Sequence, residues 1–155
     1  MNKRIAIFPG SFDPITKGHE NILRRALPLF DEIIISIGKN SSKQNYFPLE
    51  KREKWIRQVF QNEPKVRVET YTGLTVEFCK KMKANFILRG LRTSADFEFE
   101  KAIAQNNHIM VPEVETIFIL PIPELSAINS TIVRDIIRNG GNASPFIPDS
   151  INLND

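Results

Sequence analysis

The residues with the clearest chemical potential lie near the start of the chain, in the pattern Gly10-x-Phe12-Asp13-Pro14-x-Thr16-x-Gly18-His19. Gly10 follows a short apolar run, and a residue without a side chain lets the backbone approach a ligand closely. Gly18 permits a tight entry into the helix expected to follow, and His19 stands in the first turn of that helix. Unpaired N–H groups and the dipole at a helix start favour anions. The pattern therefore predicts an anion site that contains His19.

The elements that must position this motif alternate between strand-like and helix-like segments. Continuous apolar runs typical of buried strands occupy residues 5–8, 33–37, 86–88 and 116–120, and a weaker run, expected near a sheet edge, occupies residues 66–68. Apolar residues recur at helical spacing over residues 18–30, 48–61, 76–82, 96–110 and 130–139, and Pro28 is expected to disturb the last turn of the first helix. Such alternation predicts a parallel sheet. We expect an α/β fold: a single-domain, Rossmann-like doubly wound sheet of five parallel strands with helices on both faces.

Ligands of an open parallel sheet bind beyond the carboxyl ends of its strands. Beyond the second to fifth strands stand polar and glycine-containing segments, at residues 39–43, 71–75, 89–92 and 126–131. With His19, these segments would bring hydroxyls, lysines and arginines to one edge of the sheet, which favours a phosphate site. Neither Gly-x-x-x-x-Gly-Lys-Ser/Thr nor Gly-x-Gly-x-x-Gly occurs, so P-loop hydrolysis and dinucleotide redox chemistry lose most of their support.

The length of 155 residues predicts one domain, residues 1–155. A tail from about residue 141 is rich in proline and apolar residues, and either a short helix or a partner contact would suit it. No apolar run approaches the ~20 residues of a membrane span, and no signal peptide is recognisable. The single cysteine, Cys79, excludes an internal disulfide and a cysteine-rich zinc site. A cytoplasmic protein is therefore expected.

The net charge of +3 arises from 21 basic and 18 acidic residues, which are interspersed. No run of five like charges occurs. We therefore expect neither a nucleic-acid nor a membrane partner, and the mild positive charge fits a protein that handles anionic phosphates.

The first motif resembles the signature of the nucleotidyltransferase superfamily with the (His/Thr)-x-Gly-His motif. Ile128-Asn129-Ser130-Thr131-x-x-Arg134 is similar to the second signature of that superfamily, although Asn129 stands where serine is usual. The remaining markers resemble the phosphopantetheine adenylyltransferase family: Lys43, Phe47-x-Leu49-Glu50-x-Arg52, and the segment from Arg89-Gly90-Leu91-Arg92 to Glu100. Ser11 replaces a frequent threonine and keeps the hydroxyl. The similarity extends from Arg4 to about Asn139.

This resemblance implies transfer of AMP from ATP to 4′-phosphopantetheine, which gives dephospho-coenzyme A and pyrophosphate by direct in-line attack in coenzyme A biosynthesis. It implies catalytic roles for His19 and Lys43. It implies an acceptor site that contains Ser11, Lys43, Leu74, Thr75 and Arg89. The ATP-binding residues that it implies are Ser11, Phe12, His19, Gly90, Leu91, Arg92, Glu100, Leu125, Ser126, Ala127, Ile128, Asn129, Ser130 and Thr131.

The resemblance also implies that Mg²⁺ accompanies ATP, held mainly by substrate oxygens and water, and it names no protein ligand for the metal. Family members assemble as homohexamers and respond to coenzyme A as a feedback inhibitor, so both properties are expected here.

Other interpretations remain open at this stage. A sister transferase acting on nicotinate mononucleotide or glycerol 3-phosphate would share Gly18-His19, and a non-catalytic nucleotide-binding or nucleic-acid-binding module belongs to another class. Arg89 could pair with a carboxylate of the following helix instead of phosphate. Ser130 and Thr131 could cap the last helix. Trp55 and the phenylalanines are expected in the core, and Cys79 is expected to be inert.

Overall fold

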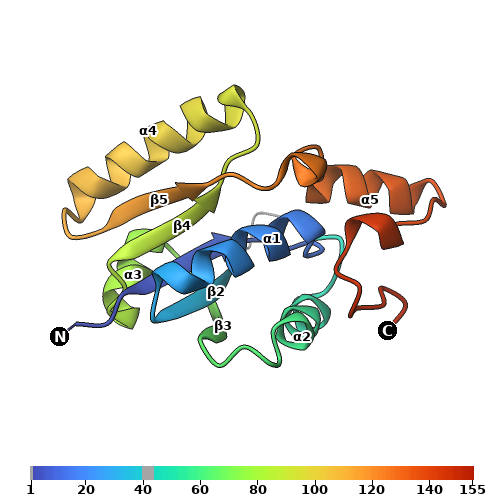
Figure 1. Cartoon of the computed structure of the whole chain (residues 1–155), viewed down its shortest axis with the longest axis horizontal. Coiled ribbons are helices and arrows are strands. Elements are labelled where there is room, and N and C mark those ends of the chain that lie inside the picture. The colour runs from blue at the N-terminus through green and yellow to red at the C-terminus, as the bar shows by residue number, and fades with distance from the viewer. Residues whose placement is uncertain (1, 40–43) are drawn as a thin grey trace.

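A computed structural model describes residues 2–39 and 44–155. Its five strands form one all-parallel sheet in the order β3-β2-β1-β4-β5, which confirms the predicted fold (Figure 1). The strands are β1 (Ile5–Gly10), β2 (Glu32–Gly38), β3 (Val66–Tyr71), β4 (Phe86–Gly90) and β5 (Glu115–Ile119). As predicted, the weakly apolar third strand lies at an edge.

Five α-helices connect or follow the strands: α1 (Lys17–Ala26), α2 (Leu49–Val59), α3 (Thr75–Met82), α4 (Ser94–Met110) and α5 (Ser130–Arg138). The first predicted helix divides, because α1 ends at Ala26 and a 3-10 turn with Pro28, Leu27–Leu29, follows. This is the expected effect of proline. A second 3-10 turn, Pro123–Leu125, precedes α5.

The alternation of side chains along the strands divides the core between the two faces of the sheet. Ala6 and Phe8 of β1 face the larger cluster, where Trp55 of α2 and Val133 of α5 are buried beside residues of α1. Ile7 faces the smaller cluster with α3 and the residues after α4. Trp55 and five of the eleven phenylalanines are buried in the core as predicted, namely Phe8, Phe12, Phe30, Phe60 and Phe78.

Cys79 lies buried in the smaller cluster, as its place on the apolar side of α3 predicts. Burial raises the pKa of its thiol to about 12. An uncharged thiol is a poor nucleophile, so the structure agrees with an inert cysteine.

The expectation for the phenylalanines is wrong in α4. Phe97 is 40% exposed and Phe99 is 69% exposed, and Glu100 is the only buried residue of that helix. Figure 1 shows α4 beside β5 at the edge of the sheet, where one side of the helix has no further layer to cover it. An apolar residue on a helix at a sheet edge therefore need not enter the core.

The tail is ordered on the protein surface and enters the core at its apolar positions. It forms a 3-10 turn, Ser144–Phe146, and buries Ala143, Ile147 and Ile151 in the larger cluster. Of the two possibilities left open by the sequence, the tail thus forms a short helical turn packed on its own chain. None of the described helices has the length and apolar content needed to cross a membrane.

Candidate active site

Two adjoining hollows lie at the carboxyl ends of the strands. The larger, about 750 Å³, lies between the ends of β1 to β4, α3 and α4, and the smaller, about 300 Å³, lies between the β1–α1 loop and the starts of α1 and α5. Both contain Pro9, Gly10, Ser11 and Arg89. They meet where the chain, having built β2 and β3 on one side of β1, places β4 on the other side. Ligands bind at such switch points in open parallel sheets.

The β1–α1 loop turns sharply at Phe12, whose φ of +48° lies in the left-handed region that non-glycine residues rarely adopt. Its ring is buried and packs edge-on against His19, with 4.9 Å between ring centroids. A Cβ on Gly10 would lie 3.1 Å from the Phe12 ring. The glycine therefore makes room for Phe12, in addition to any close approach to a ligand. Phe12 in turn supports one face of the His19 imidazole.

His19 is fixed by a reciprocal cap at the start of α1. Its imidazole Nδ1 accepts the Thr16 backbone N–H at 3.0 Å, and its backbone N–H donates to Thr16 Oγ1 at 3.3 Å. Because Nδ1 accepts, the proton of the neutral ring belongs on Nε2. Burial lowers the pKa of His19 to about 4, with further lowering by Arg89 and Arg92. The neutral ring therefore carries a hydrogen-bond donor on Nε2 at physiological pH, and the residue lines the smaller hollow.

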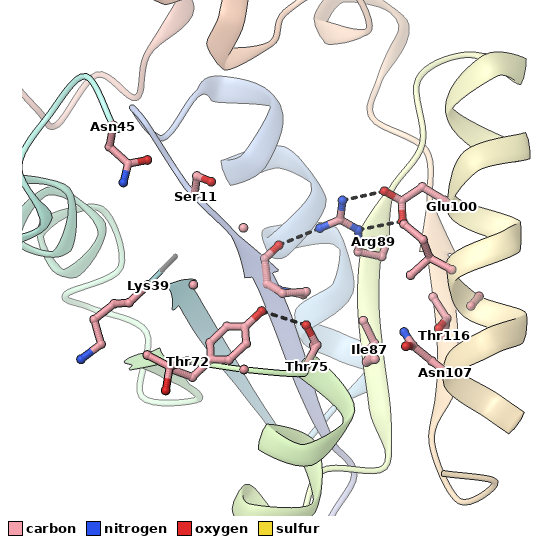
Figure 2. Close-up of a pocket in the computed structure, with 17 residues that line it drawn as sticks. Ser11, Lys39, Asn45, Thr72, Thr75, Ile87, Arg89, Glu100, Asn107 and Thr116 are labelled. Atoms are coloured by element: carbon pink, nitrogen blue, oxygen red, sulfur yellow. Dashed lines mark hydrogen bonds and ion pairs between the residues drawn. The ribbon is translucent and has the colours of Figure 1, made fainter. Parts of the chain in front are cut away.

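Arg89 ends β4 at the junction of the two hollows. Its Nε and Nη2 donate to the two carboxylate oxygens of Glu100 at 3.0 and 2.6 Å, and its Nη1 donates to the Pro9 carbonyl at 2.8 Å (Figure 2). The carboxylate pairing foreseen as an alternative is thus present. A guanidinium has five N–H donors, so these three bonds leave two for an anion. Glu100 orients Arg89 without exhausting it.

The second signature sits at the start of α5. Asn129, not Ser130 or Thr131, is the N-cap, and its Oδ1 accepts the Ile132 N–H at 2.8 Å. An asparagine accepts this bond with its side-chain oxygen as well as serine does. Ser130 Oγ donates to the Pro14 carbonyl at 2.9 Å and so ties the two signatures together. Arg134 donates to the Asp13 carbonyl at 2.8 Å and lines the smaller hollow.

The smaller hollow collects most of the residues that the resemblance assigns to ATP. They are Ser11, Phe12, His19, Gly90, Arg92, Leu125, Ile128, Asn129, Ser130 and Thr131. Leu91, Ser126 and Ala127 do not line it, and Leu91 is buried. Glu100 lies instead against the larger hollow and a small recess that it shares with Gly90 and Arg92.

The larger hollow contains Ser11, Thr75 and Arg89 of the predicted acceptor site. Leu74, which precedes α3, is 55% exposed and does not line it. Lys43, the other catalytic residue implied by the resemblance, lies outside the described residues. The hollow is therefore only partly lined by the residues that the sequence predicted.

Lys39 and Tyr71 line the larger hollow and belong to the segments predicted beyond the second and third strands, whereas Asn45, Asn107 and Thr116 were missed (Figure 2). Tyr71 and Thr75 share a hydrogen bond of 2.9 Å between their hydroxyl groups. A helical signal was available for α4, because Glu100, Ile103 and Asn107 follow one another at spacings of three and four and line the same hollow.

The donor set around the smaller hollow does not suit a resident magnesium ion. Magnesium prefers carboxylate and other oxygen ligands, whereas three arginines and a neutral histidine line this hollow. Both carboxylate oxygens of Asp13 are already bonded to backbone N–H groups. Among the described residues, no three His, Cys, Asp or Glu side chains gather as a metal site. The residues therefore fit anions.

Comparison with known proteins agrees with this geometry. Residues 7–136 match the model of the cytidylyltransferase-like family. A putative nicotinate-nucleotide adenylyltransferase from Vibrio parahaemolyticus superposes with a TM-score of 0.70 at 21% identity, over 96% of each chain. At that identity the likeness shows the shared fold.

Relatives of higher identity match over nearly the whole chain. The phosphopantetheine adenylyltransferase of Flavobacterium johnsoniae is 55% identical over 150 residues, which cover 97% of this chain and 98% of the relative. That of Bacteroides thetaiotaomicron is 46% identical over 151 residues, which cover 97% of this chain and 99% of the relative. With both signatures joined at one edge of the sheet, the chain belongs to the phosphopantetheine adenylyltransferase family of cytidylyltransferase-like nucleotidyltransferases.

Proposed function

We propose that this protein transfers AMP from ATP to 4′-phosphopantetheine, yielding dephospho-coenzyme A and pyrophosphate in coenzyme A biosynthesis. The observation that carries the proposal is the pair of adjoining hollows, both of which are lined by Arg89 and Ser11. A transferase that joins two phosphorylated substrates needs two sites whose reacting ends meet. The names of relatives with up to 55% identity support this choice of acceptor.

The chemistry is a direct displacement. An oxygen of the 4′-phosphate attacks the α-phosphorus of ATP, a new P–O–P bond forms, and the bond from the α-phosphorus to the bridging oxygen of pyrophosphate breaks. Because that phosphate has a second pKa of about 6, it is already anionic near neutral pH and needs little help from a base. Catalysis then consists of positioning and charge stabilisation.

Arg89 supplies the two donors that Glu100 and Pro9 leave unused, and these hold the attacking phosphate. Ser11 assists at the same junction. Lys43 neutralises the two anions as they approach. Thr75 borders the pantetheine arm, which occupies the larger hollow, whereas Leu74 lies outside the lining of that hollow.

His19 donates its Nε2 proton in a hydrogen bond to the α-phosphate as negative charge develops. The Thr16–His19 cap fixes the ring in the tautomer that this role requires, and a pKa of about 4 keeps it neutral before ATP arrives. The imidazole is thus a pre-oriented donor, and such donors need no reorganisation at the moment of reaction.

The β- and γ-phosphates of ATP lie at the start of α5, among residues 125–131, where the helix N-terminus favours anions. Gly90, Arg92 and Glu100, which share a small recess, border the adenosine, while the side chain of Leu91 is buried and lines neither hollow. Mg²⁺ enters with ATP as part of the substrate and offsets phosphate charge. No protein-bound metal takes part in the proposal.

Assembly into a homohexamer, feedback inhibition by coenzyme A and a cytoplasmic location complete the proposed function. Exposed apolar side chains on and near α4 and β5 support assembly, and they include Phe99, Ile109 and Leu120. Such side chains are typical of surfaces that meet another protein.

The deciding experiment offers the purified protein ATP and Mg²⁺ with each of three acceptors: 4′-phosphopantetheine, nicotinate mononucleotide and glycerol 3-phosphate. Pyrophosphate release is followed, and the product is identified by mass. We expect turnover with 4′-phosphopantetheine and little with the other two. Comparable kcat/KM for either rival would contradict the proposed acceptor.

A further inference from the structure

Two loops beside the larger hollow are fastened together by a buried carboxylate. Asp13, in the β1–α1 loop, is 3% exposed. Its Oδ2 accepts the Tyr46 backbone N–H at 2.7 Å, and its Oδ1 accepts the Phe47 backbone N–H at 2.9 Å. Both residues belong to the connection between β2 and α2. The carboxylate therefore holds two successive peptide groups of a loop more than thirty residues away in the chain.

A buried cation closes the same junction from α2. Arg52 is 4% exposed, and it donates from Nη1 to the Ser11 carbonyl at 2.7 Å and from Nε to the Phe47 carbonyl at 2.9 Å. Burial lowers the pKa of Arg52, and the charge of Asp13 opposes that shift. A charge is costly to bury unless it is paired and hydrogen-bonded. Arg52 meets the second condition by donating to one carbonyl of each loop.

The connection that these contacts hold lies at the larger hollow, whereas Asp13 itself lines the smaller hollow and Ser11 lines both. The β2–α2 connection contributes Asn45 to the larger hollow, and Lys39 follows β2 directly. Of the described residues from Gly38 to Phe47, none lines the smaller hollow. The ring of Phe47 also packs edge-on against Trp55, with 4.9 Å between centroids, so the end of this connection is held from two sides.

We propose that Asp13 and Arg52 are positioning residues, which hold residues 45–47, near the end of the β2–α2 connection, against the acceptor hollow and so set the place of the acceptor substrate. The inference rests on the proposed function and adds to it two residues that act on backbone groups: Asp13 lines the smaller hollow, but both of its carboxylate oxygens are bonded to backbone N–H groups. Arg52 lines neither hollow, so any effect of its replacement on turnover must pass through the backbone it holds.

Arg52→Lys is the primary test, because it keeps the charge while losing the paired geometry of the guanidinium. We expect kcat/KM for 4′-phosphopantetheine to fall about 10- to 100-fold, the range that a small misplacement of reacting groups produces. The KM for ATP should change less than about 3-fold. Asp13→Asn should act in the same direction, and it should also accelerate amide hydrogen exchange at Tyr46 and Phe47.

Arg57→Lys is the matched control. Arg57 lies on the same helix, donates to the Val68 carbonyl and pairs with Glu53, and lines neither hollow. Arg57→Lys should leave kcat/KM for 4′-phosphopantetheine and the KM for ATP unchanged.

Equal losses toward ATP and the acceptor, or unchanged kinetics in a folded Arg52→Lys protein, would overturn the proposal. So would failure of both Arg52→Lys and Asp13→Asn to fold, since the pair would then serve the fold alone. If the unmodified protein ignores 4′-phosphopantetheine, it is the proposed function that fails. Amide hydrogen exchange at Tyr46 and Phe47 then still tests whether Asp13 holds this loop. Protection of these two amides in Asp13→Asn equal to that in the unmodified protein would refute it.

Discussion

The smaller hollow and the larger hollow are built in different ways. The smaller one draws on two contiguous signatures, each formed by a loop and the first turn of the helix that follows, and bonds such as Ser130 to Pro14 join them. The larger one takes short runs of one to three residues from the ends of several strands and further residues from one face of α4. A site made mainly from two loop–helix signatures has its geometry dictated locally. A site assembled from the ends of several strands depends on how the elements around it are held.

We expect the largest loss of activity from replacement of His19, which belongs to the smaller, locally built hollow. His19→Ala should lower kcat by about 10²- to 10³-fold, as the loss of one transition-state donor typically does, while ATP binding changes only a few-fold. Steady-state kinetics and ATP titration measure the two quantities, and His108→Ala, on the exposed side of α4, is the control. A covalent adenylyl-His19 species detected by mass spectrometry would overturn direct transfer.

Acid stability tests the same residue without substrate. The pKa of His19 is about 4 in the folded protein and 6.5 ordinarily, so the unfolded chain binds the extra proton first as pH falls. The stabilisation is complete above pH 6.5 and is lost progressively toward pH 4, by about 3 kcal/mol at most. Denaturant unfolding of the unmodified protein and His19→Asn should show this difference, and parallel pH curves would mean that His19 is not held neutral.

Arg89 sharpens the comparison because it belongs to both hollows. Arg89→Ala should reduce kcat/KM for the acceptor about 10- to 150-fold, since a hydrogen bond to a charged group is worth about 1.5–3 kcal/mol. Of the two hollows, Arg92 lines only the smaller one, so Arg92→Ala should weaken the binding of ATP instead. Pairing Arg89→Ala with Glu100→Gln removes the carboxylate left without its partner. If Arg89→Ala leaves kcat/KM for the acceptor unchanged, Arg89 has a structural role and does not bind the acceptor phosphate.

We expect the smallest loss of activity from replacement of Asn107. This residue tests the larger hollow, whose lining was predicted less completely from the sequence. Asn107→Leu should lower kcat/KM for 4′-phosphopantetheine about 3- to 10-fold, the usual worth of a neutral hydrogen bond, and leave the KM for ATP unchanged. Asn106→Leu is a close control, because the Asn106 amide donates to the Ala102 carbonyl and does not line the hollow. Equal responses of the two variants would remove Asn107 from acceptor binding.

The sheet and its order of elements could be predicted because strands buried on both faces read as continuous apolar runs. His19 and the α5 start could be predicted because a helix N-terminus and its flanking residues define their own geometry. The backbone conformation of Phe12 could not be predicted in this way. A phenylalanine does not favour a positive φ, and here the packing of its ring beside His19 requires one.

Asn45 and Thr116 could not be predicted as neighbours, because their meeting depends on how strand ends align and where loops cross. Glu100 illustrates a subtler limit. Its place near the site was foreseen, whereas its bidentate hold on Arg89 depends on the distance between β4 and α4. Residue type and spacing thus identify which groups serve a site more readily than which of them serve each other.

The packed tail has a practical consequence for work on the molecule. Ile147 and Ile151 share a cluster with Val133 of α5, and Gln58 of α2 donates to the Ser150 carbonyl at 3.0 Å. The segment after α5 therefore packs against the core beside α5 and stabilises the position of this helix, which carries the second signature. Trimming the chain after Gly141 to aid crystallisation would expose apolar core and loosen the very helix whose first turn is of interest.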